Sequence, residues 1–307
     1  MQRSVVPRAL TPVHLLARCR PRVLPVILLA AAIITVACTS SAPTNPTGRQ
    51  TGAADPGVVH VHGLGVNPKD GALYAATHTG LFRIPDQGRA ERIGDRYQDT
   101  MGFTVVGPDH FLGSGHPDMR DYQAKRLPSL LGLIESTDAG TTWQPISLLG
   151  DADFHALKAA HGRVYGFNSS GNTFMVSGDG KAWETRAKVL MRDFAVSPAD
   201  AELIVAAMAQ DVQRSRDGGR TWERLHAPPL VVLAWRDADA LWGLTATGAL
   251  FQSTDAGATW QQHGAVAGQP DAFLAADEVL YVSVYQDGIY MSEDGGKSWR
   301  LRYRESA

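Results

Sequence analysis

Four stretches of the chain carry the same eight-residue pattern and decide the fold. They are Ser136-TDAGTT-Trp143, Ser215-RDGGRT-Trp222, Ser253-TDAGAT-Trp260 and Ser292-EDGGKS-Trp299. A fifth copy, Ser177-GDGKA-Trp183, is one residue shorter. The five serines are 41, 38, 38 and 39 residues apart. Self-similarity at a nearly constant period predicts a repeat architecture.

Each copy has the chemistry of a hairpin turn. The aspartates Asp138, Asp217, Asp255 and Asp294 can accept backbone N–H bonds inside the turn, and the glycines supply positive φ angles. The tryptophan that follows is expected to begin an outer strand and to cover apolar surface. The turns therefore predict strands on either side of every copy.

The repeat length predicts an all-β, six-bladed β-propeller over residues 58–304. A sixth unit has no complete copy of the pattern, but its segment 82–88 aligns with 251–257. Four strands per repeat of roughly 40 residues is the spacing of propeller blades. The blades are expected at about 59–97, 98–150, 151–188, 189–227, 228–265 and 266–304. Blade two carries an insertion near residues 113–129.

The pattern S-x-D-x-G-x-[ST]-W resembles the Asp box, or BNR repeat, of the sialidase superfamily and of sortilin-like propellers. The resemblance covers residues 59–304 and extends to bacterial lipoproteins often labelled glycosyl hydrolase. It implies that the turns are structural and lie at the periphery, away from the ligand-binding face.

The first 37 residues have the features of an export signal. Five arginines and no acidic residue precede an apolar run of 15 residues, 23–37, which is shorter than the roughly 20 residues of a spanning helix. The run ends in Ile34-TVA-Cys38, which resembles the lipobox of bacterial lipoproteins. The resemblance implies lipidation at Cys38. A chance cysteine after an ordinary signal peptide is the alternative.

The predicted mature protein starts with a flexible tether. Residues 38–57 are rich in Ser, Thr, Pro and Gly, a composition typical of a linker. We therefore expect an exported lipoprotein facing the outside of the cytoplasmic membrane. Loss of five arginines changes the formal net charge from −2 to −7, so no general attraction to nucleic acid is expected. No cysteine follows Cys38, which excludes a disulfide framework.

Aligning the innermost strands of the six units places polar residues around one mouth of the central channel. The first aligned positions are His62, Met101, His155, Arg192, Val231 and Asp271. The next positions are small or apolar. The convergence predicts a ligand site at His62, Met101, His155, Arg192 and Asp271.

Histidines cluster near this mouth in the first three blades. His60 lies two residues before His62, while His78 and His116 are at the ends of second strands. Imidazole is a ligand for zinc and copper, and thioether suits reduced copper. The set His60, His62, His78 and His116 therefore predicts a copper or zinc site, and a water-filled polar rim is the alternative.

A sialidase-like glycoside hydrolase is the competing interpretation. The segment Phe82-RI-Pro85 matches the Arg-Ile-Pro motif of sialidases, but the alignment places Arg83 on a peripheral strand, facing away from the channel. Two facing catalytic groups, which retaining glycoside chemistry needs, are not evident. No nucleophile elbow, phosphate-binding loop or H-E-x-x-H motif occurs.

These observations predict a lipid-anchored binding or assembly protein of the cell envelope that acts as a monomer. Its partner would be an unknown glycan or envelope protein. A scaffold that binds proteins through residues 115–129 is a third possibility. Propellers host binding and catalysis alike, so the fold alone does not choose between these functions.

Overall fold

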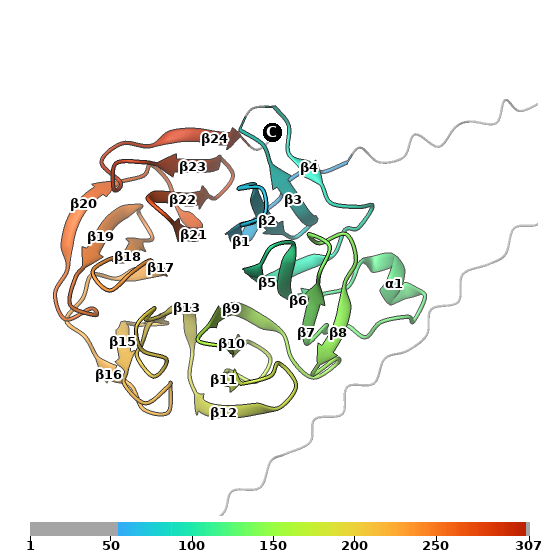
Figure 1. Ribbon diagram of the computed structural model, residues 1–307, viewed down its shortest axis with the longest axis horizontal. Helices are drawn as coiled ribbons and strands as arrows, with labels where there is room; N and C mark the ends of the chain where they lie inside the picture. The colour runs from blue at the N-terminus through green and yellow to red at the C-terminus, as the bar shows by residue number, and fades with distance from the viewer. Residues whose placement is uncertain (1–54, 87, 305–307) are drawn as a thin grey trace, which may run out of the picture. The chain divides into compact units, whose positions relative to one another are not determined.

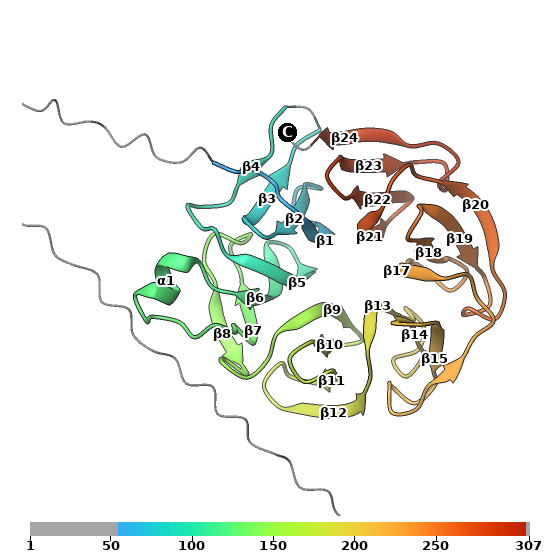
Figure 2. The same cartoon turned by 180° about the vertical axis from the view of Figure 1, so that it is seen from behind.

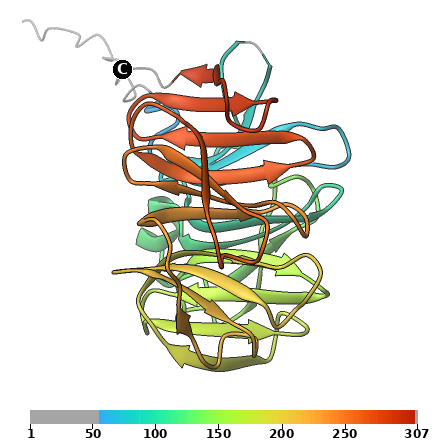
Figure 3. The same cartoon turned by 90° about the vertical axis from the view of Figure 1, so that its left-hand side faces the viewer.

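The computed structural model describes residues 55–86 and 88–304, which form six four-stranded antiparallel sheets. The sheets follow one another around a ring in chain order (Figure 1). Seen edge-on, the strands run from one face of the ring to the other (Figure 3). The predicted six-bladed β-propeller is confirmed. The predicted signal peptide, Cys38 and most of the tether lie outside the described residues.

The blades are numbered one to six in chain order, and each is one continuous segment. Blade one has β1 (Val61–Val66), β2 (Leu73–Thr77), β3 (Gly80–Ile84) and β4 (Glu91–Arg92). Blade two has β5 (Asp99–Gly107), β6 (His110–His116), β7 (Leu133–Ser136) and β8 (Gln144–Ser147). Blade three has β9 (Phe154–Ala160), β10 (Arg163–Asn168), β11 (Thr173–Ser177) and β12 (Trp183–Lys188).

The second half of the ring repeats this plan. Blade four has β13 (Met191–Val196), β14 (Ile204–Met208), β15 (Val212–Ser215) and β16 (Glu223–Arg224). Blade five has β17 (Leu230–Trp235), β18 (Leu241–Thr245), β19 (Ala249–Ser253) and β20 (Gln261–Ala265). Blade six has β21 (Pro270–Ala276), β22 (Val279–Val284), β23 (Gly288–Ser292) and β24 (Arg300–Arg304).

The repeated turn joins the third strand of a blade to its outer strand. In blade four, Ser215 Oγ donates to Asp217 Oδ1 (2.8 Å) and accepts from Gly219 N (2.7 Å). Asp217 also accepts from the backbone N–H and the hydroxyl of Thr221. The hydroxyl and N–H of Thr221 hold the pKa of Asp217 at about 2. The charged carboxylate of Asp217 thus accepts hydrogen bonds from backbone N–H groups of the turn that have no partner in the sheet.

The core of the ring lies between the blades. Each of the six blade interfaces buries one apolar cluster. Strands β2, β14 and β18 are buried along their whole length, because both of their faces pack on neighbouring blades. The repeated turns contribute as well. At Gly219, where φ is +89°, an added methyl group would overlap the ring of Phe174 in the preceding blade.

No strand is shared between the first and last blades, so side chains alone close the ring. Val61, Leu64 and Ile84 of blade one pack against Ala272 and Ile289 of blade six. Arg302 Nη2 also donates to the carbonyl of Ile84 (3.2 Å). This interface sets the position of β1 relative to β21.

The insertion of blade two contains the one helix in residues 55–86 and 88–304, α1 (Met119–Gln123). It lies at the outer side of the ring, beyond β8 (Figure 1). Asp118 caps it by accepting from Arg120 N (2.9 Å). Over these residues no helix combines the length and the apolar character needed to cross a membrane.

Removing apolar volume from the closing interface should destabilise the whole ring. Ile289 is fully buried there, and Ile289→Ala is expected to lower the free energy of unfolding by about 2–5 kcal/mol, measured by urea denaturation. Leu301→Ala on the outer strand of the same blade, where the side chain is 40% exposed, is the control. Equal effects of the two substitutions would contradict this account of ring closure.

Candidate metal centre

The innermost strands of all six blades line one central cavity of about 250 Å³. Figure 2 shows these strands, β1, β5, β9, β13, β17 and β21, around the centre of the ring. Each blade contributes at least one residue to the wall: His62, Met101, His155, Arg192, Val232 and Asp271. The structure therefore brings the five residues predicted to bind a ligand into one cavity.

The predicted mouth positions share an unforeseen backbone feature. The pairing register of each inner strand shifts near its start, at a residue that has no partner on the second strand, and β5 shifts a second time near its end. The six residues are His62, Met101, His155, Arg192, Val231 and Asp271, the same positions that the alignment identified. An extra residue of this kind forms a β-bulge, which redirects its side chain. Six bulges thus form a ring of redirected side chains.

Blade five departs from the aligned register. Val232, not Val231, lines the central cavity, while Val231 borders a neighbouring pocket together with Arg192. Since neither valine is polar, this blade contributes only apolar surface.

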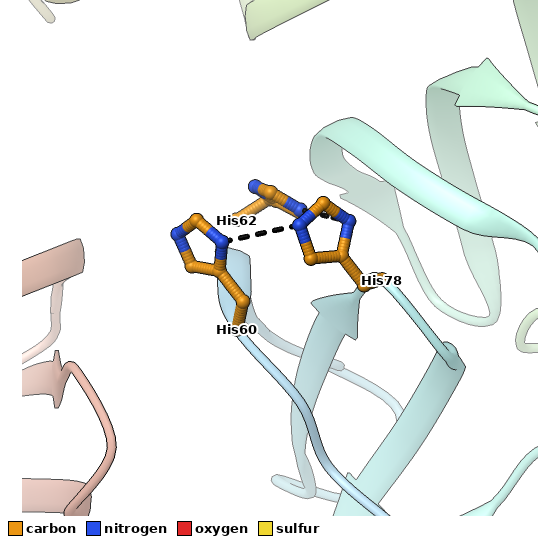
Figure 4. A group of neighbouring side chains, drawn as sticks. All are labelled: His60, His62 and His78. Atoms are coloured by element: carbon orange, nitrogen blue, oxygen red, sulfur yellow. Dashed lines mark hydrogen bonds between the residues drawn. The ribbon is translucent and has the colours of Figure 1, made fainter. Parts of the chain in front are cut away.

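Three histidines of blade one meet beside this cavity (Figure 4). His60 Nδ1 lies 3.2 Å from His78 Nε2, and His62 Nε2 lies 3.2 Å from His78 Nδ1. Each histidine offers one ring nitrogen to a group whose members lie within 4.8 Å of one another. His60 precedes β1 and has a φ of 48°, an uncommon backbone conformation that turns its ring toward His62. We call His60, His62 and His78 the histidine triad.

Carboxylates from the two neighbouring blades hold the triad from outside. Asp99 Oδ1, from blade two, lies 2.9 Å from His78 Nδ1 and 3.5 Å from His62 Nε2. Asp271 Oδ1, from blade six, lies 3.8 Å from His60 Nε2. Carboxylates in this arrangement fix the tautomer and orientation of metal-binding imidazoles.

Burial favours the uncharged form of two triad members, His60 and His62. Burial, followed by repulsion from His62 and His78, lowers the pKa of His60 to about 4. Burial also lowers the pKa of His62, against the opposing effect of Asp99. A neutral imidazole carries one N–H and one lone pair. His60 Nδ1 and His78 Nε2 lie within hydrogen-bond distance of each other, and the tautomers of the two rings decide whether either nitrogen carries a proton.

With no proton on either nitrogen, the lone pairs of His60 Nδ1 and His78 Nε2 would repel unless a cation lay between them. Ligand atoms at 2.0–2.1 Å from a tetrahedral zinc ion are roughly 3.3–3.4 Å apart. The 3.2 Å separation of His60 Nδ1 and His78 Nε2 is close to this value. The spacing of the two nitrogens is therefore compatible with a shared metal ion.

The structure places His116, the fourth predicted metal ligand, in a different group. Its Nε2 lies 3.8 Å from Asp153 Oδ2, and Asp153 also pairs with His155 Nε2 at 2.7 Å. Although burial alone would raise the pKa of Asp153, His155 and Ser169 lower it on balance. His116 Nδ1 forms a hydrogen bond with the carbonyl oxygen of Ser129. Because a carbonyl oxygen can only accept, His116 Nδ1 carries the proton.

Three arginines of the first two blades are engaged in ion pairs away from the cavity wall. Arg83, on β3, pairs with Asp70 (3.2 Å) and is not part of the cavity wall. Arg120 pairs with Asp118 and Asp95, and Arg126 pairs with Asp121. Arg120 and Arg126 are therefore held in ion pairs and do not line the central cavity.

Asp99 and Tyr285 are site residues outside the positions predicted from the sequence. Asp99 lies two residues before the bulge residue Met101. His60 and Asp153 have the same offset from the bulge residues of their blades, His62 and His155. Applying the same offset to every blade would have revealed Asp99. Tyr285, whose ring centroid lies 5.7 Å from that of His60, follows the second strand of blade six. Its contact depends on ring closure and has no sequence signal.

No protein-family model matches the chain, and a search of curated proteins finds no match. Solved structures share the fold. A gluconolactonase of Xanthomonas campestris has a TM-score of 0.58 at 14% identity, with 75% of this chain and 84% of that chain covered. A chain of a nidogen/laminin complex has a TM-score of 0.59 at 13% identity, with 76% and 95% covered.

A GH74 xyloglucanase of Xanthomonas campestris is also similar, with a TM-score of 0.53 at 20% identity. The alignment covers 81% of this chain but only 46% of that enzyme. At these identities the similarities show the propeller fold alone. Membership of the sialidase superfamily stays a prediction.

Replacing Asp99 tests whether its carboxylate orients the histidines of the triad. Asp99→Ala is expected to weaken the binding of Zn²⁺ or Cu²⁺ by about 10–100-fold, because His62 and His78 lose the carboxylate that orients them. Calorimetric titration of the metal-free protein measures the change. Asp277→Ala, on an exposed turn of blade six, should bind metal as the unchanged protein does. Unaltered affinity in Asp99→Ala would exclude this role.

Proposed function

We propose that this protein binds one zinc or copper ion through His60, His62 and His78 at the mouth of its propeller. The observation that carries the proposal is the histidine triad itself, with its ring nitrogens within 4.8 Å of one another. Imidazole nitrogen is a preferred ligand of both metals. Structural support from Asp99 and Asp271 is the arrangement expected around metal-binding histidines.

Three protein ligands favour a functional role over a structural one. Structural zinc sites are usually closed by four protein ligands, whereas open sites keep one position for water or another ligand. The ring is stabilised by six apolar clusters, none of which includes a triad histidine. The fold is therefore expected to persist without the ion, and the ion to serve binding or transfer.

The choice between zinc and copper depends on the cavity wall. Met101 lines the same cavity as His60 and His62, and a thioether favours reduced copper over zinc. Both ions should be tested under defined redox conditions.

Metal titration tests the proposal directly. The metal-free protein is expected to bind one Zn²⁺ or Cu²⁺ per chain, and His78→Ala should lower the affinity at least 10-fold, since it removes one of three ligands. Isothermal titration calorimetry gives stoichiometry and affinity. His226→Ala, an exposed histidine before blade five, is the matched control. Absence of metal binding by the unchanged protein, or equal affinity of His78→Ala, would contradict the proposal.

We further propose that the site faces the outside of the cytoplasmic membrane, held there by lipid on Cys38. The basis is the export signal and the lipobox-like segment Ile34-TVA-Cys38. Such a protein would handle metal at the cell envelope, by itself or for a partner there.

Cys38→Ala tests the anchor. The unchanged protein, expressed in a bacterium, is expected in the membrane fraction and to incorporate labelled fatty acid. The variant should lose the label and move to the soluble fraction. Label incorporation by Cys38→Ala would disprove lipidation at this cysteine.

Glycoside hydrolysis has less support than metal binding. The carboxylates on the cavity wall are already engaged: Asp193 pairs with Lys158 (3.4 Å) and Asp271 lies beside His60. The xyloglucanase similarity concerns the fold and places no catalytic residue in this chain. Metal binding is the function that this geometry supports best.

A further inference from the structure

Arg192 is a cation on the wall of the central cavity with no anionic partner. Among the residues that the structure describes, no carboxylate oxygen lies within ion-pair distance of its guanidinium, although it lines the cavity. Other arginines of blade four differ: Arg214 pairs with Glu223 and Arg224 with Asp211. A guanidinium without a counter-ion is suited to bind an anion.

The nearest acidic residue does not neutralise Arg192. Asp193 Oδ1 lies 3.4 Å from Lys158 Nζ, and Asp193 Oδ2 accepts from Leu233 N at 2.8 Å. Both carboxylate oxygens are therefore occupied by other donors. The guanidinium stays available on the cavity side.

The position of Arg192 relates it to the histidine triad. Arg192 is the bulge residue of blade four, and in a ring of six blades the fourth lies opposite the first (Figure 2). His62 is the bulge residue of blade one. The same backbone device therefore directs a cation and a metal-binding imidazole into one cavity from opposite walls.

The charge of the site requires an anion only when metal is present. Asp99 and Asp271 surround the triad, so the metal-free site is negative on that side and repels anions. A divalent ion would neutralise both carboxylates and leave Arg192 uncompensated. Its open coordination position would accept an oxygen ligand.

We propose that Arg192 and the metal ion together bind one small organic oxyanion, such as a carboxylate, across the central cavity. The inference rests on the proposed metal site and names the ligand class of that site. The planar guanidinium matches carboxylate geometry by paired hydrogen bonds. A cavity of about 250 Å³ lies just below the usual range of about 300–1,000 Å³ for small-molecule pockets, which favours a small ligand over a polymer.

Cobalt substitution provides the test. Co²⁺ can replace zinc in imidazole sites and reports its ligands by visible absorption. Succinate added to the Co²⁺-loaded protein is expected to change the spectrum with saturation, whereas uncharged succinamide should not. Arg192→Met is expected to bind succinate at least 10-fold more weakly while keeping the succinate-free Co²⁺ spectrum. Arg224→Met, an exposed arginine on the outer strand of the same blade, should behave as the unchanged protein.

The outcomes separate this inference from the proposed function. Normal Co²⁺ uptake with equal succinate binding by Arg192→Met would overturn the role of Arg192 and leave the metal site intact. Normal uptake without any response to succinate in the unchanged protein would overturn the oxyanion ligand. Failure to take up Co²⁺, Zn²⁺ and Cu²⁺ alike would overturn both.

Discussion

The ring of blades closes through apolar packing between blade six and blade one, with no strand passing from one to the other. Val61, Leu64 and Ile84 on one side and Ala272 and Ile289 on the other supply this contact. The triad depends on it, because His60 immediately precedes β1, beside the interface. Only in the closed ring do Asp271 and Tyr285 of blade six reach His60.

The second constraint is the bulge that recurs in every inner strand. A regular antiparallel pair would send alternate side chains to opposite faces of the blade. The extra residue interrupts this alternation and, in every blade but the fifth, directs its side chain to the central cavity. Blade by blade, the bulge presents imidazole, thioether, imidazole, guanidinium, an apolar group and carboxylate. The same β-bulge thus carries a different side chain from one blade to the next.

The proposed chemistry follows from how charge is arranged around this mouth. Three imidazoles converge on one side, flanked by Asp99 and Asp271, and Arg192, which has no ion-pair partner among the described residues, lines the cavity from the opposite blade. A cation satisfies the first group and an anion satisfies the second. The two would therefore bind with positive coupling, each raising the affinity for the other. The peripheral turns take no part, since their aspartates are already engaged by Ser and Thr side chains and backbone N–H groups.

The sequence by itself determined the fold, because the repeated turn is a local structure whose Ser, Asp and Gly bond to one another over a few residues. Its period then fixed the number of blades, and the alignment found the ring position that the bulges occupy. Tertiary structure alone decided which histidines meet. His78 joins His60 and His62, whereas His116 joins Asp153 and His155, because neighbouring second strands end one blade apart. The alignment put Asp271 at the mouth, but only the tertiary structure brought Asp271 and Tyr285 beside His60. Contacts between blades depend on ring curvature and closure, which no local pattern encodes.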